Sequence, residues 1–245
     1  MIIISCVYIS PSTQQFNEYV NGGNEEQYMN LVADRLVEYL NNAGICTYRN
    51  SPLMDVNEVV IDSNSKAPSL HFAIHSNAAP EYLSGKLMGT DVYYYPTSVE
   101  GLRLAEITAD NFKSIYPNPD KVQIRPSASL AELKRTTAPA VLVETAYHDN
   151  VEDAQWIKDN IDAIAENFAL SIIEFLGAET TSTPATVVTM GSRLNMRAAP
   201  TILSPIIRKI PNGATVNVYN RQGNWYNVEY GGTRGYVSRR YLSFT

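Results

Sequence analysis

One histidine and several carboxylates follow apolar segments of this sequence in a pattern that suits metal-assisted hydrolysis. His75 and Glu144 each end an apolar segment, Glu25 and Glu26 open a predicted helix, and a polar turn covers residues 10–15. Imidazole nitrogens and carboxylate oxygens are common zinc ligands. A further carboxylate can take a proton from an attacking water. These residue types therefore predict a catalytic zinc site with a separate general base.

Glu144 is the strongest candidate for the base. It directly follows Ala-Val-Leu-Val, and a carboxylate at the end of a buried strand costs free energy unless it is paired or functional. His71 lies on the same strand face as His75 but about 13 Å away, so the two cannot share a metal ion and we expect His71 to be structural. His148 follows Glu144 and is a candidate to line the site.

Strand and helix patterns alternate through the first 178 residues. The predicted strands are 2–9, 45–49, 70–75, 90–95 and 140–144, and the predicted helices are 25–42, 56–63, 99–115 and 151–176. Asn24 is the expected N-cap of the first helix, with Gln27 three residues later. This alternation predicts an α/β fold with a mainly parallel sheet and helices on both faces. Such sheets carry their functional residues at the carboxyl ends of the strands.

The charge of the chain changes sign near residue 178. Residues 1–178 carry 11 lysines and arginines against 23 aspartates and glutamates, whereas residues 179–245 carry 8 against 2. Residues 179–185 are small and polar and read as a linker. Residues 186–245 show short alternating strands between turn residues, which predicts a small all-β barrel. We therefore expect two domains, of which the basic one binds a polyanion.

The composition excludes several other classes of protein. Hydrophobic residues make up 44 % and charged residues 18 %, as in globular domains, and no apolar run approaches the ~20 residues of a membrane span. The opening segment lacks a basic region before its apolar run, so we expect no signal peptide and synthesis in the cytoplasm. We accordingly expect Cys6 and Cys46 to be buried, reduced thiols.

Three segments together resemble a known enzyme family. They are residues 24–30 (NEEQYMN), 73–78 (AIHSNA) and 130–144 (LAELKRTTAPAVLVE). Over residues 1–176 the chain resembles the zinc-dependent N-acetylmuramoyl-L-alanine amidases, the type-3 amidase family of autolysins and phage endolysins. The resemblance implies that His75 binds zinc and that Glu144 is the catalytic base. It also implies a glutamate ligand at the start of the first helix, where the spacing to Asn30-Leu31 favours Glu26 over Glu25.

The turn after the first strand departs from that family. The family has a zinc-binding histidine there, whereas this chain has no histidine between residues 1 and 70. A carboxamide oxygen is the expected substitute, with Gln14 as the first choice and Thr13 and Gln15 behind it; a histidine from elsewhere is the other option. Because a neutral oxygen is a poorer zinc ligand than imidazole, we expect weaker zinc binding or a broader choice of metal.

The basic C-terminal segment resembles a bacterial SH3-like module. The resemblance rests on residues 192–200, 210–213, 223–228, 235–237 and 241–242. Such modules commonly bind peptidoglycan, and the positive charge suits an anionic cell wall. Trp225 and Tyr226 are the predicted wall-binding aromatic residues, although aromatic side chains in so small a barrel also build its core.

Taken together, these features predict a peptidoglycan hydrolase that cleaves the amide bond between N-acetylmuramic acid and L-alanine of the stem peptide. Asn77 is expected to orient the substrate or the metal ligands, and Arg125 and Arg135 to meet the acidic peptide. The enzyme would be an endolysin or an autolysin that reaches the wall after release. A zinc carboxypeptidase on the same polymer and a metal-poor, non-catalytic wall-binding protein are the alternatives. Nucleic-acid binding is disfavoured, because the chain shows no recognition helix or base-stacking pattern.

Overall fold

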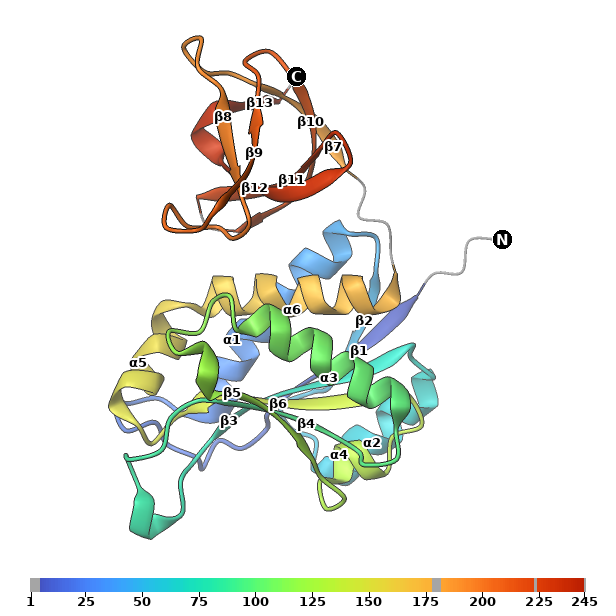
Figure 1. Cartoon of the computed structure of the whole chain (residues 1–245). Coiled ribbons are helices and arrows are strands. Elements are labelled where there is room, and N and C mark those ends of the chain that lie inside the picture. Colours follow the sequence, from blue (N-terminus) through green and yellow to red (C-terminus); the bar gives the residue numbers. More distant parts are fainter. Residues whose placement is uncertain (1–4, 178–181, 223, 245) are drawn as a thin grey trace. The chain divides into compact units, whose positions relative to one another are not determined.

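The computed structural model describes residues 5–177, 182–222 and 224–244 and divides the chain into two compact units, Met1–Ala178 and Glu179–Thr245 (Figure 1). The division falls where the charge changes sign. Residues 183–185, which the sequence analysis assigns to a linker, instead belong to the first strand of the second unit.

The first unit is built on a six-stranded sheet with the strand order β2-β1-β3-β6-β4-β5. These strands are β1 (Cys6–Pro11), β2 (Cys46–Arg49), β3 (Leu70–Asn77), β4 (Thr90–Tyr94), β5 (Val122–Pro126) and β6 (Ala140–Tyr147). All neighbouring pairs are parallel except β4 and β6, which are antiparallel. The start of β4 therefore lies at the same sheet edge as the carboxyl ends of β1, β3 and β6 (Figure 1).

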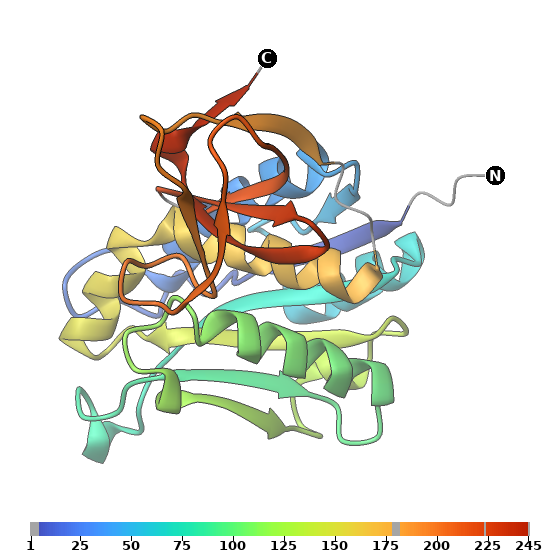
Figure 2. The same cartoon turned by 45° about the horizontal axis from the view of Figure 1, so that its top comes forward.

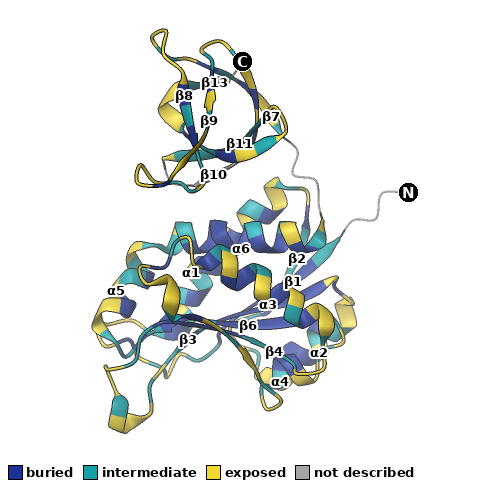
Figure 3. Cartoon of the chain, in the orientation of Figure 1, coloured by how far each residue is buried: buried dark blue, intermediate teal, exposed yellow. Residues whose placement is uncertain are grey.

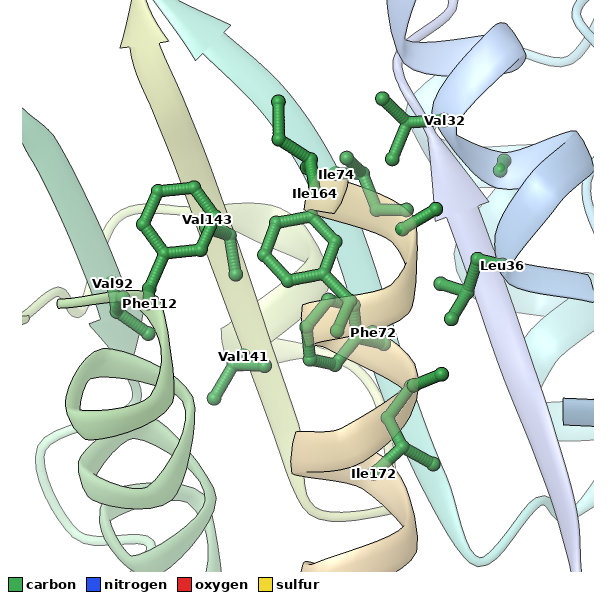
Figure 4. Packing of buried hydrophobic residues seen from close by; sticks show 14 of the residues in the cluster. Val32, Leu36, Phe72, Ile74, Val92, Phe112, Val141, Val143, Ile164 and Ile172 are labelled. Carbon is green, nitrogen blue, oxygen red and sulfur yellow. The ribbon is translucent and has the colours of Figure 1, made fainter. Parts of the chain in front are cut away.

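Helices cover both faces of this sheet, as the sequence predicts. They are α1 (Glu25–Asn42), α2 (Val56–Lys66), α3 (Val99–Phe112), α4 (Ala131–Lys134), α5 (Val151–Asp159) and α6 (Ile161–Leu176). Helices α1, α3 and α6 cover one face, where residues such as Phe72, Val141, Phe112 and Ile172 form the main core (Figure 4). Helices α2 and α4 lie on the other face (Figure 1), where a smaller cluster surrounds Leu133. The buried residues lie in the strands of the sheet and on the helices that pack against it (Figure 3).

The predicted long helix 151–176 is in fact two helices. Asn160 leaves helical geometry, with φ −125° and ψ 20°, and separates α5 from α6. The sequence analysis also missed β5, a short strand at the edge of the sheet. The expected N-cap of α1 is confirmed, because the Asn24 side chain accepts a hydrogen bond from the backbone amide of Gln27.

Cys6 and Cys46 form a disulfide bond, so the expectation of reduced thiols is wrong. The cause is the register of the sheet. Strands β1 and β2 pair in parallel with Cys6 opposite Cys46, and the two Cα atoms are 4.3 Å apart. The bond joins the first edge strand of the sheet to its neighbour.

The second unit is an all-β barrel-like domain whose seven strands have the order β13-β7-β10-β11-β12-β8-β9. Its strands are β7 (Thr183–Val187), β8 (Leu194–Arg197), β9 (Ile206–Ile210), β10 (Thr215–Gln222), β11 (Trp225–Tyr230), β12 (Thr233–Ser238) and β13 (Leu242–Phe244). Side chains such as Val187, Met196 and Val228 fill its core. Gly235 allows β12 to approach β8 closely, since a Cβ atom there would lie 2.9 Å from the backbone oxygen of Arg197.

Within the described ranges, no helix combines the length and hydropathy that are needed to cross a bilayer.

Candidate active site

His75 lies near the carboxyl end of β3, where its ring stands between two carboxylates. Its Nδ1 atom is 2.8 Å from Glu25 Oε1, and its Nε2 atom is 3.4 Å from Glu132 Oε1. Burial alone would lower the pKa of His75, but the hydrogen bonds to Glu132 and Glu25 raise it well above 6.5. Both ring nitrogens of His75 therefore lie beside carboxylate oxygens.

Glu25, rather than Glu26, is the carboxylate that faces Nδ1 of His75. Glu25 is buried in the first turn of α1 and accepts a hydrogen bond of 2.6 Å from Asn17 Nδ2. Burial alone would raise its pKa, but the hydrogen bonds from His75 and Asn17 lower the pKa below its usual value. Glu26 instead approaches the Asn30 side chain at 3.3 Å.

The structure thus contradicts the placement of Glu26 beside His75. Consecutive helical residues point about 100° apart, so only one of the two glutamates can face the sheet edge. Glu25 shares the buried side of α1 with Met29 and Val32, which follow it by four and seven residues. This spacing in the sequence was the signal that could have identified Glu25.

Gln14 lies beside His75, as the sequence predicts, but its amide nitrogen faces the ring. Gln14 Nε2 is 3.4 Å from His75 Nδ1, while Gln14 Oε1 accepts a hydrogen bond from Asn17 Nδ2. To bind a cation through its oxygen, the Gln14 amide would turn over and give up its hydrogen bond from Asn17. Thr13 and Gln14 also line a cavity of about 390 Å³ that borders His75 and Glu132.

Glu144 lies opposite His75 in the pairing of β6 with β3. The residue is half-buried, and its Oε2 atom is buried and has no hydrogen-bond partner among the described residues. Burial raises the pKa of Glu144 to about 7; the nearby charge of His75 opposes this rise, and those of Glu25 and Asp91 add to it. A carboxylate with a pKa near 7 and an unpaired oxygen is suited to accept and return a proton.

Asp91 is a carboxylate of this site that sequence reasoning missed. It lies opposite Glu144 in the antiparallel pair of β4 and β6. Arg125 Nε donates to Asp91 Oδ1 at 2.5 Å, and Asn77 Nδ2 lies 3.4 Å from Asp91 Oδ2. Two of the predicted substrate-binding residues, Asn77 and Arg125, therefore contact Asp91 in this structure. Arg135 lies elsewhere and donates to Asn57.

Glu132 is the second missed carboxylate. It comes from α4 and accepts hydrogen bonds from Ser10 Oγ and His71 Nε2, besides its approach to His75. Glu132 contacts both His71 and His75. It therefore links the two histidines, which are too far apart to share a metal ion. The signal in the sequence was a glutamate inside the otherwise apolar segment Leu130-Ala-Glu-Leu133.

His148 is buried on the other side of β3 from Glu132. Its Nδ1 atom is 2.9 Å from the backbone oxygen of Ser76, and its ring stacks on Tyr19 with a centroid separation of 5.3 Å. The Tyr19 hydroxyl donates to Ser76 Oγ. The His148 side chain thus contacts Ser76 and Tyr19 and supports the residue next to His75.

The donor set fits a metal ion in part. Glu25 Oε1 and His75 Nδ1 face each other at 2.8 Å, and an acidic oxygen beside an imidazole nitrogen is a suitable pair of zinc ligands. The described residues contain no group of three or more histidine, cysteine, aspartate or glutamate side chains that could hold a metal ion. Gln14, whose side chain lies 3.4 Å from His75 Nδ1, could offer a neutral oxygen as a further ligand.

The second unit carries a basic cavity of about 770 Å³. It is lined by Arg193, Arg197, Arg239 and Arg240 together with the aromatic side chains of Trp225 and Tyr241. Among the described residues that line it there is no aspartate or glutamate. The structure separates the two predicted wall-binding aromatics, because Trp225 lines this cavity whereas Tyr226 packs against the domain core and Phe244.

Two protein families match the chain. Residues 12–174 match the family described as N-acetylmuramoyl-L-alanine amidase, and residues 192–243 match the bacterial SH3 domain. A comparison with curated proteins found no match.

Several solved structures resemble the first unit. The N-acetylmuramoyl-L-alanine amidase AmiC2 of Nostoc punctiforme is 20 % identical with a TM-score of 0.64, over 71 % of this chain and 97 % of that one. The catalytic domain of CwlV from Bacillus (Paenibacillus) polymyxa var. colistinus is 18 % identical with a TM-score of 0.63, over 71 % and 99 %. The catalytic domain of the CD27L endolysin, which targets Clostridia difficile, is 21 % identical with a TM-score of 0.56, over 69 % and 96 %. At these identities the likeness shows a shared fold.

Proposed function

This chain belongs to the N-acetylmuramoyl-L-alanine amidase family and is a peptidoglycan amidase, and we propose that Glu25 and His75 hold a zinc ion beside the general base Glu144. The bond cleaved joins N-acetylmuramic acid to L-alanine of the stem peptide. Members of this family are generally zinc-dependent. Gln14 remains the proposed third ligand, because its side chain lies within 3.4 Å of His75 Nδ1.

In this proposal Glu144 carries a proton from the attacking water to the leaving nitrogen. A zinc ion would supply a Lewis acid that polarises the amide carbonyl and lowers the pKa of the attacking water toward ~7. Glu144 Oε2 accepts a proton from the water as its oxygen bonds to the carbonyl carbon. Glu144 then returns the proton to the nitrogen of L-alanine when the carbon–nitrogen bond breaks. The products are a carboxylic acid on the sugar and a free amine on the peptide.

The observation that carries this assignment is the unpaired, buried oxygen of Glu144 beside His75 and Glu25. A buried carboxylate without a hydrogen-bond partner is costly for folding. Its pKa of about 7 lies close to the pH at which a base both accepts and returns a proton efficiently. A purely structural role would favour a paired or apolar side chain at this strand position.

Mass analysis of digested cell wall tests the reaction. The amidase should produce stem peptides with a new L-alanine amino terminus and glycan strands with free lactyl carboxyl groups. Release of single amino acids from the peptide carboxyl end would identify a carboxypeptidase instead. If no product forms and the purified protein holds no metal, the chain is a non-catalytic wall-binding protein.

We further propose that the basic cavity of the second unit attaches the enzyme to an anionic cell wall. Four arginines line it beside Trp225, and peptidoglycan with its attached polymers presents carboxylate and phosphate groups. Arginine binds such groups through several donors, and an aromatic face can stack against sugars. Binding to purified walls that weakens as salt rises supports this role.

The disulfide supports a site of action outside the reducing cytoplasm. Disulfides persist in oxidising surroundings such as the cell surface. The Cys6–Cys46 bond therefore suits an enzyme that works on the wall after release, as we propose. Free-thiol titration of the protein before and after contact with the culture medium tests this step.

A further inference from the structure

Glu132 is a buried carboxylate that the proposed reaction does not use, and its three side-chain partners can all donate hydrogen bonds. Its Oε2 atom accepts from Ser10 Oγ at 2.5 Å and lies 2.8 Å from His71 Nε2, while Oε1 lies 3.4 Å from His75 Nε2. Glu132 is thus a buried carboxylate whose Oε1 atom lies toward His75.

His71 fixes the orientation of Glu132. Ser63 Oγ lies 2.9 Å from His71 Nδ1, and the ring stacks on Tyr8 with a centroid separation of 5.2 Å. With Nδ1 accepting from the Ser63 hydroxyl, the ring's hydrogen lies on Nε2 and is donated to Glu132 Oε2. All of these groups are buried in the sheet face under α2 and α4. The chain of contacts leaves Glu132 Oε1 directed at His75.

We infer that Glu132 is a positioning residue that holds the Nε2 hydrogen of His75, so that Nδ1, beside Glu25, is the nitrogen that binds the metal. This inference rests on the proposed zinc site. An imidazole that binds a metal through one nitrogen donates its other N–H to an acceptor, and a carboxylate acceptor strengthens the ligand. Glu132 has the carboxylate group, the burial and the direction that this role requires.

The reverse arrangement, with the metal on Nε2 and Glu132 as a ligand, agrees less well with the site. Glu144 interacts electrostatically with Glu25, which faces Nδ1, so the proposed base belongs to the Nδ1 side. Glu132 Oε2 is already engaged by Ser10 and His71. A metal on Nε2 would therefore separate the metal from the base.

The experiment measures zinc affinity of the full-length protein by competition with a chromogenic chelator. Glu132→Ala should bind zinc about 10- to 100-fold more weakly than wild type, as expected for loss of a hydrogen-bond partner behind a ligand. Glu132→Gln keeps the volume of the side chain and one acceptor oxygen, so its zinc affinity should lie between those of wild type and Glu132→Ala. Glu106→Gln, which removes an exposed carboxylate on α3, is the matched control and should bind like wild type. Thermal unfolding of the metal-free proteins identifies a variant that fails to fold.

A second readout needs no variant. Long-range ¹H–¹⁵N spectra of the zinc-loaded protein should show His75 with zinc on Nδ1 and hydrogen on Nε2, in a chain with three histidines. Zinc on Nε2, or folded Glu132 variants with wild-type affinity, would overturn the role of Glu132 while leaving the zinc proposal intact. If the wild type binds no zinc, the zinc proposal fails and this inference fails with it.

Discussion

Glu144 and Asp91 lie directly opposite each other in the antiparallel pair of β6 and β4. Asp91 is compensated by Arg125 at 2.5 Å, whereas Glu144 Oε2 has no hydrogen-bond partner among the described residues. The sheet thus presents two acidic side chains in two different environments. Burial raises the pKa of the unpaired one, Glu144, to about 7. This difference makes Glu144 the group that can exchange a proton.

Replacing Glu144 by glutamine should abolish hydrolysis. The amide retains the size of the side chain but cannot accept the proton of the attacking water, so we expect a loss of kcat of at least about 100-fold. Zinc content should not change, because Glu144 is not among the proposed ligands. The measurement is release of free L-alanine amino termini from purified walls. Activity within tenfold of wild type would remove Glu144 from the mechanism.

The same substitution should stabilise the metal-free protein at high pH. Glu144 has a pKa of about 7 in the folded chain and about 4.5 when unfolded. Between these values the unfolded chain has lost the proton that the folded chain keeps, so stability falls as pH rises. The loss is complete above pH ~7 and amounts to about 3 kcal/mol at most. Urea unfolding should show Glu144→Gln more stable than wild type at pH 8, with a much smaller difference at pH 4. An equal difference at both pH values would contradict the raised pKa.

Asp91 and Arg125 should shift the pH dependence of activity in opposite directions. Asp91→Asn removes a negative neighbour of Glu144, so the acid limb of the kcat/KM profile should move to lower pH. Arg125→Gln leaves Asp91 uncompensated, so the limb should move to higher pH; each shift is up to about one unit. If Arg125 instead binds the acidic stem peptide, Arg125→Gln would raise KM and leave the pH profile unchanged.

The sequence predicted the layers of this fold because alternating strand and helix patterns follow directly from periodicity. It also predicted that His75 and Glu144 lie close together, since each lies at or near the end of an apolar segment that must be a buried strand. Asp91 could not be predicted in this way. It lies at the start of its strand, and only the reversed direction of β4 brings that start opposite Glu144.

Glu132 and the disulfide depend on tertiary contacts that local patterns do not contain. Glu132 reaches His71 and His75 across 61 and 57 residues of sequence, through a four-residue helix. The Cys6–Cys46 bond depends on the register of two parallel strands, and a sequence separation of 40 does not define that register. Glu25 is different, because its spacing to Met29 and Val32 in the sequence already indicates that it lies on the buried side of α1.

Glu25 and Glu26 form a matched pair for testing the metal site. Glu25→Gln removes the carboxylate that faces His75 Nδ1 and should weaken zinc binding by more than about 100-fold. This loss is larger than that expected for a residue that only hydrogen-bonds to a metal ligand. Glu26→Gln changes a neighbouring carboxylate that contacts Asn30 and should leave the affinity within about twofold. Chelator competition measures both. The opposite order of effects would restore Glu26 as the ligand.

Trp225 and Tyr226 form a similar pair in the second unit. Trp225 lines the basic cavity, so Trp225→Ala should reduce wall binding by roughly tenfold, or about 1.4 kcal/mol, without lowering stability to the same extent. Tyr226 packs on the domain core and on Phe244 with a ring separation of 5.3 Å, so Tyr226→Ala should lower the free energy of unfolding by about 2 kcal/mol.

Pelleting with purified walls measures the binding, in a Glu144→Gln background that leaves the walls intact. Binding of both the parent and Trp225→Ala should weaken as salt rises, because the arginines of the cavity remain. If Tyr226→Ala lost wall binding while keeping its stability, and Trp225→Ala bound normally, the cavity would not be the wall-binding surface.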